Sequence, residues 1–267
     1  MRILVKIGGA QLSDPRSRSE LARAVSQAQV AGHQVILVHG GGDQIRGLTS
    51  QLGIEDRYHE GLRVTDAATA EAVLMVLGGQ VNRQLVAELG AQGVPAVGIT
   101  GADGGSFTAA PLQRDGVELG YVGTVHRVQS ALVESLLADG LVPVIATVAP
   151  LDPDLPGSPE HFYNINADHC AGPLAAALGA DTLLFLTNVP GVLDQDQRRI
   201  PALSPQDCAA LRTSGVIHGG MIPKVEAALS AVAAHPGGTI KVAPAEGKQA
   251  ILAALQSGTG TNFTPDS

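Results

Sequence analysis

The chain has 267 residues, a formal net charge of −8, 45% hydrophobic residues and 16% charged residues. This balance is typical of a globular protein with one large or two small domains, and it argues against extended disorder. With no Trp, three Tyr, four Phe and an acidic balance, a surface for nucleic acid is not expected. Only four of the 17 basic residues are lysines, namely Lys6, Lys224, Lys241 and Lys248.

The cysteines and the apolar runs predict a compartment. Cys170 and Cys208 lie far apart and form no CxxC pattern, which favours a reduced, cytoplasmic chain. No window approaches 18 consecutive apolar residues, and Lys6 interrupts the apolar run at the N-terminus. Neither a membrane-spanning helix nor a signal peptide is therefore expected, and the expected partners are small molecules rather than membranes.

Short apolar runs alternate with helical patterns along the chain. Strands are predicted at residues 3–7, 35–38, 94–99, 142–147, 182–187 and 239–242. Helices are predicted at 15–31, from 43 to about 52, at 66–92 with a Gly-Gly interruption at 78–79, at about 128–139, up to about 178, and at 205–213, 222–234 and 246–256. This order predicts an α/β fold, a three-layer αβα sandwich with a mostly parallel open sheet.

Local signals refine three of these elements. Asp14-Pro15 is typical of a helix N-cap followed by the first helical residue. Residues 107–127 alternate in polarity around Asp115-Gly116, which predicts a β-hairpin. Pro173 predicts either a kink or a late start of the helix that contains it.

Four glycine-rich turns lie where a parallel sheet can hold anions, at residues 6–9, 40–42, 101–105 and 219–224. Glycine lets backbone N–H groups approach a phosphate, and a helix N-terminus adds partial positive charge. No turn matches GxxxxGK[ST] and no GxGxxG follows a strand, so the P-loop and dinucleotide fingerprints are absent. For any single turn, close packing of a strand and a helix explains the glycines equally well.

Two of the four lysines belong to these turns. Lys6 lies in an apolar strand beside Gly-Gly, and Lys224 follows Gly-Gly and Pro223 at the start of a predicted helix. A lysine is rarely buried without a partner, and a lysine in the first turn of a helix opposes the macrodipole unless an anion lies there. We therefore interpret the two as a pair that brackets a transferring phosphoryl group, with solvated lysines as the alternative.

Further polar side chains stand in apolar surroundings. Asn164, Asn166 and Asp168 precede an apolar run, where they either cap a helix or bind a carboxylate substrate and fix the lysines. Arg63 suits bidentate binding of a carboxylate, or else forms a surface salt bridge. The eight histidines show no HxH or HExxH spacing, and no GxSxG is present. Neither a protein-bound zinc nor a serine hydrolase is therefore expected.

Six strings, in order along nearly the whole chain, resemble the amino acid kinase family, and within it the branch that phosphorylates N-acetyl-L-glutamate. They are VKIGGA at 5–10, VHGGGDQI at 38–45, GLRVTD at 61–66, YNINAD at 163–168, LTNVPGVL at 186–193 and GGMIPKV at 219–225. The resemblance implies a single kinase domain over residues 1–267. Residues 1–165 would form a lobe that binds the acyl-amino acid and makes a homodimer, and residues 166–267 would form a lobe that binds the nucleotide. The Pro-rich loop at 149–160 is the best lobe boundary in the sequence.

The resemblance also implies roles for particular residues. Lys6 and Lys224 would stabilise the transferring γ-phosphoryl group of ATP, and Asp168 would hold both lysines. Phosphate would be bound by Gly8, Gly9 and Gly41. The acyl-amino acid would be bound by Gly41, Gly42, Arg63, Asn164 and Asn166. The nucleotide would be contacted by Thr187, Asn188, Gly191, Leu193 and Met221. The reaction would need ATP and Mg²⁺, without a metal ligand from the protein, and would yield the acyl phosphate of arginine biosynthesis.

This sequence departs from the family pattern at several points. Asn188 replaces the Asp that is usual in the TDVxG string, and the loop at 150–162 is longer than expected. The chain begins at the first strand and shows no evident arginine-site pattern near its C-terminus, so an arginine-insensitive homodimer is expected. Two alternatives stay open: a kinase of the same fold that acts on carrier-protein-linked aminoadipate, and a non-catalytic amino-acid sensor.

Overall fold

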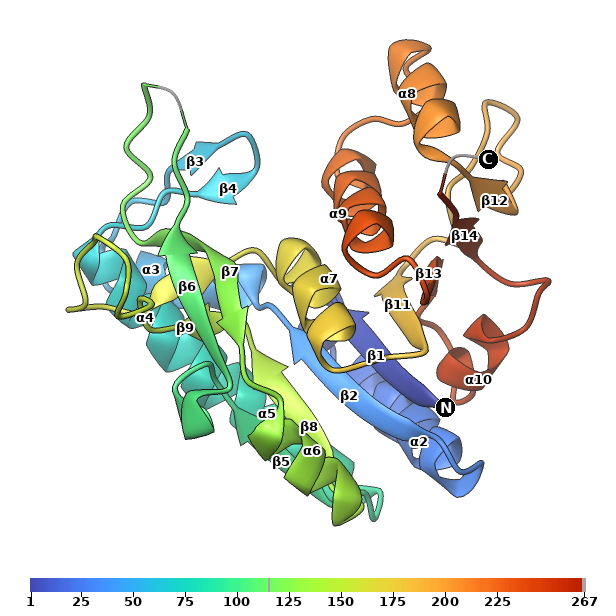
Figure 1. The fold of residues 1–267 in the computed structure, drawn as a ribbon, viewed down its shortest axis with the longest axis horizontal. Helices are drawn as coiled ribbons and strands as arrows, with labels where there is room; N and C mark the ends of the chain where they lie inside the picture. Colours follow the sequence, from blue (N-terminus) through green and yellow to red (C-terminus); the bar gives the residue numbers. More distant parts are fainter. Residues whose placement is uncertain (115, 266–267) are drawn as a thin grey trace.

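An eight-stranded sheet runs through the centre of the computed structural model, which describes residues 1–114 and 116–265 (Figure 1). The strand order is β12 (Ala202–Leu203), β14 (Thr261–Phe263), β13 (Thr239–Pro244), β11 (Thr182–Thr187), β1 (Arg2–Ile7), β2 (Gln34–His39), β8 (Val142–Ala146) and β5 (Ala96–Ile99). All neighbouring strands are parallel except β13 and β14. The predicted mostly parallel sheet is confirmed, and every predicted strand is present within about two residues.

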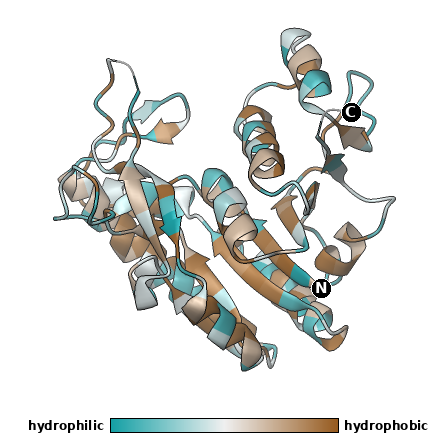
Figure 2. Cartoon of the chain, viewed as in Figure 1, coloured by the Kyte–Doolittle hydropathy of each residue, from teal (hydrophilic) through white to brown (hydrophobic). Residues whose placement is uncertain are grey.

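Helices cover both faces of this sheet and complete the predicted αβα sandwich. One face packs on α2 (Pro15–Val30), α3 (Gly42–Gln51), α4 (Ala67–Leu74), α5 (Asn82–Ala91) and α10 (Ala250–Ala254). The other face packs on α6 (Ala131–Ala138), α7 (Ala167–Ala177), α8 (Pro205–Thr213) and α9 (Met221–Ala234). The strands between them are mostly hydrophobic (Figure 2).

Successive side chains of β1 point alternately into the two apolar cores, one on each face of the sheet. Ile3, Val5 and Ile7 pack in the core on the α2 side, whereas Leu4 packs in the core on the α7 side. The same period of two turns Lys6 toward α7 rather than toward α2. One charged residue in an apolar strand is therefore delivered to the face where α7 begins.

Two smaller sheets lie beside the main one. β6 (Phe107–Pro111) and β7 (Val122–Val128) pair antiparallel, which confirms the predicted hairpin, and Asp115 of its predicted turn lies outside the described residues. β7 continues to β10 (Tyr163–Ile165) and β9 (Val148–Ala149). A separate ribbon consists of β3 (Tyr58–His59) and β4 (Leu62–Arg63). The short strands β3, β4, β9 and β10 were not predicted because each is too brief to show a period.

The helical stretch predicted at 66–92 is continuous, and its glycines do not interrupt it. α4 passes into a π-helical turn, η1 (Met75–Val81), and then into α5 without a loop between them. Gly78 and Gly79 lie inside the π-turn. The prediction of a break at the Gly-Gly pair is therefore corrected to a change of helix type.

Other helices differ from the predictions at their ends. α7 begins at Ala167 and runs through Pro173, so the late start is wrong, and Asn166 is its N-cap. The last predicted helix, at 246–256, is reduced to α10 (Ala250–Ala254). The predicted cap at Asp14 is confirmed, because its side chain accepts a hydrogen bond from the Ser17 N–H at 2.8 Å.

The predicted division into two lobes crosses the middle of the main sheet. β1 pairs with β2 on one side and with β11 on the other, so the sheet is continuous from β5 to β12. The boundary between residues 165 and 166 falls immediately before α7. The two lobes and their separate ligands stay a prediction.

Candidate active site

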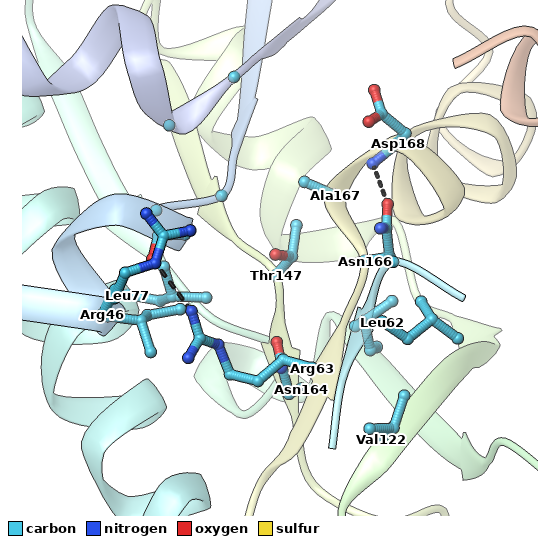
Figure 3. A pocket seen from close by; sticks show the side chains of 18 of the residues that line it. Arg46, Leu62, Arg63, Leu77, Val122, Thr147, Asn164, Asn166, Ala167 and Asp168 are labelled. Carbon is cyan, nitrogen blue, oxygen red and sulfur yellow. Dashed lines mark hydrogen bonds between the residues drawn. The ribbon is translucent and has the colours of Figure 1, made fainter. Parts of the chain in front are cut away.

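A cleft of about 250 Å³ opens beyond the carboxyl ends of β1 and β2 (Figure 3). Its wall consists of the glycine turns after these strands, together with β4, β10 and the start of α7. Ligands of open α/β sheets bind at this edge. The predicted residues that line it are Lys6, Gly8, Gly9, Gly41, Gly42, Arg63, Asn164, Asn166 and Asp168. The fold thus brings the predicted phosphate, substrate and catalytic positions together.

Asp168 lies between the two predicted catalytic lysines. Its Oδ1 is 2.6 Å from the Nζ of Lys6, and the Nζ of Lys224 is 3.4 Å from both of its oxygens. Lys6 comes from the end of β1, and Lys224 comes from the first turn of α9, which packs against α7. The geometry brings together a cation, an anion and a second cation from three distant parts of the chain.

Burial and charge set the protonation of this group. Burial lowers the pKa of Lys6 to about 8, although Asp168 acts to raise it. Burial acts to raise the pKa of Asp168, but Lys6 and then Lys224 outweigh it, so the pKa lies below its usual value. Lys6 is therefore a cation and Asp168 an anion at neutral pH. Their side chains are only 5% and 12% exposed, so water screens their charges weakly.

The first two glycine turns touch each other at the floor of the cleft. A Cβ atom on Gly9 would lie 2.9 Å from the backbone N of Gly42 and 3.3 Å from the Cα of Gly41. Gly41 is also the N-cap of α3, so the free N–H groups of that helix begin at the turn. Only glycine permits this approach, and it leaves backbone N–H donors for an anion.

Arg63 is held inside the cleft and does not form a surface salt bridge. The residue is 7% exposed, its Nη1 contacts Asp56, and its Nη2 donates to the backbone oxygen of Gly42 at 3.1 Å. The guanidinium carbon lies 4.9 Å from the centroid of the Tyr58 ring. These contacts fix the plane of the guanidinium, which then has donors left for a carboxylate.

The two asparagines near β10 differ in what they already bind. The Oδ1 of Asn166 accepts hydrogen bonds from the N–H groups of Asp168 and His169, so the capping interpretation holds for this residue. The Nδ2 of Asn164 donates to the hydroxyl of Thr65 at 3.2 Å. Both residues also line the cleft, so capping and substrate binding are compatible at Asn166.

Sequence analysis missed several residues of the cleft. Arg46, Tyr58 and Leu77 line it, and the Arg46 side chain is 60% exposed and pairs with Asp43 at 3.1 Å. Figure 3 shows Arg46 on the same side of the cleft as Arg63. A signal was present for Arg46, since it stands one helical turn after Gly42. Tyr58 and Leu77 carry no local signal, because other elements place them there.

The predicted nucleotide residues are only partly brought together. Gly191, Leu193 and Met221 line a second cavity of about 490 Å³, which includes the first residue of α9. Asn188 lines a different hollow, beside Ile7. Thr187 is 4% exposed at the end of β11, and its hydroxyl donates to the Asn188 side chain. The first turn of α9 carries both Met221, which lines the second cavity, and Lys224, which contacts Asp168 of the cleft.

Over residues 1–114 and 116–265, no group of three His, Cys, Asp or Glu side chains is arranged to hold a metal ion. Within the same described part, no helix combines the length and apolarity needed to cross a membrane.

A mostly parallel sheet, two touching glycine turns and a lysine–carboxylate–lysine group together define an α/β protein whose cleft suits an anionic ligand. The chain belongs to the amino acid kinase family, whose family model matches residues 1–242.

Relatives and solved structures extend this assignment. Acetylglutamate kinases of Brucella abortus (strain S19) and Brucella canis are each 40% identical over 275 residues, covering 98% of this chain and 90% of theirs. The crystal structure of smu.665 from Streptococcus mutans UA159 has a TM-score of 0.82 at 29% identity and covers 99% of both chains. N-acetylglutamate synthase from Neisseria gonorrhoeae has a TM-score of 0.82 at 21% identity, covering 100% of this chain and 60% of its own, which supports the fold alone.

Proposed function

We propose that this chain is an acetylglutamate kinase, which transfers the γ-phosphoryl group of MgATP to the γ-carboxylate of N-acetyl-L-glutamate. The observation that carries the proposal is the contact of Lys6 and Lys224 with one buried carboxylate, beside two glycine turns that offer backbone N–H donors. The 40% identity to acetylglutamate kinases over 98% of the chain supports the choice of substrate.

The proposed reaction is an in-line displacement at phosphorus. A γ-carboxylate oxygen of the substrate attacks the γ-phosphorus of ATP, and the bond from that phosphorus to the bridging oxygen breaks. ADP leaves with the electron pair, and the substrate keeps a mixed carboxylic–phosphoric anhydride. The carboxylate is already ionised at neutral pH, so no protein base or nucleophile is needed.

The protein contributes charge and position. Lys6 and Lys224 would neutralise the oxygens of the transferring group, and the N–H groups at Gly9 and Gly41 would add hydrogen bonds. The Gly8 N–H donates to the Gln11 Oε1 at 2.9 Å, so it would bind phosphate only in exchange for that side chain. Asp168 keeps the lysines close together, which two isolated cations would resist. The Asp168 carboxylate is already paired with both lysines. Mg²⁺ would therefore be bound by the phosphates of ATP and not by Asp168.

The acyl-amino acid would lie between Asp168 and the arginine side of the cleft. Arg63 would bind its α-carboxylate with the donors that Asp56 and Gly42 leave free. Asn164, Asn166 and the N–H of Gly42 would bind its remaining polar groups. ADP and ATP would occupy the cavity beside Gly191, Leu193 and Met221. Asn188 lines the separate hollow beside Ile7, so a contact of Thr187 or Asn188 with the nucleotide would need the nucleotide to reach beyond this cavity.

A hydroxamate assay tests this function. With MgATP and hydroxylamine, the purified chain should convert N-acetyl-L-glutamate to its hydroxamate and should act much more slowly on L-glutamate and on N-acetyl-L-aspartate. Carrier-linked aminoadipate and added arginine complete the panel. Turnover of the carrier-linked substrate without turnover of N-acetyl-L-glutamate would establish the alternative kinase. ATP-independent binding without any turnover would establish the amino-acid sensor.

Three finer expectations belong to the proposal. The homodimer and the place in arginine biosynthesis rest on resemblance. The insensitivity to arginine rests on the lack of an evident arginine-site pattern, and the cytoplasmic location rests on two distant cysteines without a CxxC pattern. A sizing column run with and without arginine should show one dimeric species. Hexamers, or inhibition by micromolar arginine, would contradict the arginine-insensitive dimer.

A further inference from the structure

A fully buried polar pair lies directly behind the second glycine turn. His39 ends β2, immediately before Gly40, and Asn82 is the first residue of α5. Both residues are 0% exposed. The Nε2 of His39 is 3.0 Å from the Nδ2 of Asn82, and the Nδ1 of His39 is 3.0 Å from the backbone oxygen of Gly40. The proposed mechanism uses neither side chain.

The partners of this pair fix one pattern of protons. The Gly40 oxygen can only accept, so the Nδ1 of His39 carries the proton and donates to it. The Nε2 then accepts from the Asn82 amide, which also donates to the Val144 oxygen at 2.9 Å. The Arg83 guanidinium donates to the Asn82 Oδ1 at 2.6 Å. Burial lowers the pKa of His39 to about 4, which keeps the ring neutral and the pattern intact at neutral pH.

The surrounding backbone is adapted to let Asn82 reach this point. A Cβ atom on Gly98 of β5 would lie 1.7 Å from the Asn82 Oδ1, so only glycine leaves room for the amide. Buried amides with every donor and acceptor engaged are costly to assemble and strongly specify one arrangement. The side chain that Gly98 of β5 lacks therefore leaves the space that the Asn82 side chain of α5 occupies.

The π-turn directs side chains of this continuous helix toward the glycine turn at two positions. In an α-helix of 3.6 residues per turn, side chains five positions apart point about 140° away from each other. The wider π-turn brings such positions toward one face. Here Leu77 and Val81 approach Gly41 so closely that a Cβ there would lie 2.8 and 3.2 Å from their methyl groups. Asn82, five positions after Leu77, meets His39 one residue before that turn.

We propose that Asn82 and His39, aimed by the π-turn η1, are positioning residues that hold the Gly40–Gly42 turn in its catalytic geometry. His39 of the pair binds the Gly40 oxygen, and Leu77 and Val81 lie closely against Gly41. The N–H of Gly41 is thereby directed at the transferring phosphoryl group. This inference rests on the proposed kinase function.

The variant Asn82→Ala tests the inference in the full-length chain. We expect kcat to fall roughly tenfold to 100-fold while KM for N-acetyl-L-glutamate and MgATP changes by less than about threefold. Leu85→Ala is the matched control, because Leu85 is 0% exposed in the same helix, belongs to the apolar core and has no side-chain group that can hydrogen-bond to the pair. It should lower the melting temperature at least as much as Asn82→Ala and leave kcat unchanged.

A second variant keeps the test meaningful if Asn82→Ala folds poorly. Asn82→Asp keeps the shape of the side chain but cannot donate to Nε2, so a neutral His39 must move its proton away from Gly40. A doubly protonated His39 can donate to both partners, and the neighbouring charge that opposes this form is the Arg83 guanidinium. We expect kcat of Asn82→Asp, relative to the unsubstituted chain, to rise as the pH falls from 8 to about 5.5.

The outcomes separate the two proposals. If the unsubstituted chain does not phosphorylate N-acetyl-L-glutamate, the proposed function fails before the variants are compared. If it does, and if folded Asn82→Ala retains full kcat or Leu85→Ala loses kcat to the same extent, the positioning role is overturned. The positioning role is also overturned if the kcat of Asn82→Asp, divided by that of the unsubstituted chain, does not change with pH.

Discussion

At the scale of one residue, the position of Lys224 determines whether its charge is solvated or paired inside the protein. On an exposed helix it would be a solvated charge, but here its Nζ lies 3.4 Å from both oxygens of Asp168. We expect Lys224→Ala to lower kcat roughly 100-fold to 1,000-fold, since it removes a cation that faces the developing charge. The measurement is steady-state kinetics at saturating MgATP. Circular dichroism should show an unchanged fold, and undiminished kcat would exclude the assigned role.

Lys6 predicts opposite responses of activity and stability to alkaline pH. Its pKa is lowered to about 8 in the folded chain, against 10.5 when unfolded, so the unfolded state binds more protons between these values. The contribution of Lys6 to the free energy of unfolding therefore rises as the pH increases from 8 to 10.5. Its cationic form, on which the proposed reaction depends, is lost over the same range.

The expected pH profile follows directly. The value of kcat/KM should fall as the pH rises through about 8, while the folded fraction measured by circular dichroism stays constant. Bound phosphate should shift the fall in kcat itself to higher pH, because an added anion favours charged Lys6. A kcat/KM that stays flat from pH 7 to 10 would contradict this role for Lys6.

At the scale of elements, the two glycine turns act as one unit because their backbones touch. A methyl group on Gly9 would lie 2.9 Å from the Gly42 nitrogen, which belongs to backbone and cannot rotate away. We expect Gly9→Ala to push the turns apart and to lower kcat more than tenfold through misplaced N–H donors.

Gly47→Ala provides the control for that substitution. Gly47 is an exposed residue of α3, and a Cβ there meets nothing within 4 Å. The change should leave activity intact and raise the free energy of unfolding by up to about 1 kcal/mol, as alanine in a helix does. Equal activity of the two variants in the hydroxamate assay would show that the two glycine turns do not act as one unit.

At the scale of the whole molecule, strand β1 joins the two predicted lobes. β1 pairs with β2 in the predicted N-terminal lobe and with β11 in the predicted C-terminal lobe, so neither half keeps a complete sheet alone. We expect a single cooperative transition in calorimetry, with equal calorimetric and van't Hoff enthalpies. Two resolved transitions, or a stably folded fragment of residues 1–165, would show independent lobes.

The sequence by itself determined the elements that depend on neighbours in the chain. Apolar runs predicted the long strands, Asp14 predicted a helix cap, and the six strings predicted the family. These signals are local, because a period of two, a cap or a glycine turn needs only a few adjacent residues. The glycine turns at 6–9 and 40–42 and Lys6 were therefore visible in the sequence as candidates for anion binding, and the structure brings them to one cleft.

Only the tertiary structure decided which candidates meet. Lys6 and Lys224 come from opposite ends of the chain, and they reach Asp168 because β1, α7 and α9 pack together. The π-turn, the His39–Asn82 pair and the place of Tyr58 depend on helix type and on packing between distant elements. No local pattern encodes such contacts, because they arise from the order of the strands and from the space that neighbouring elements leave.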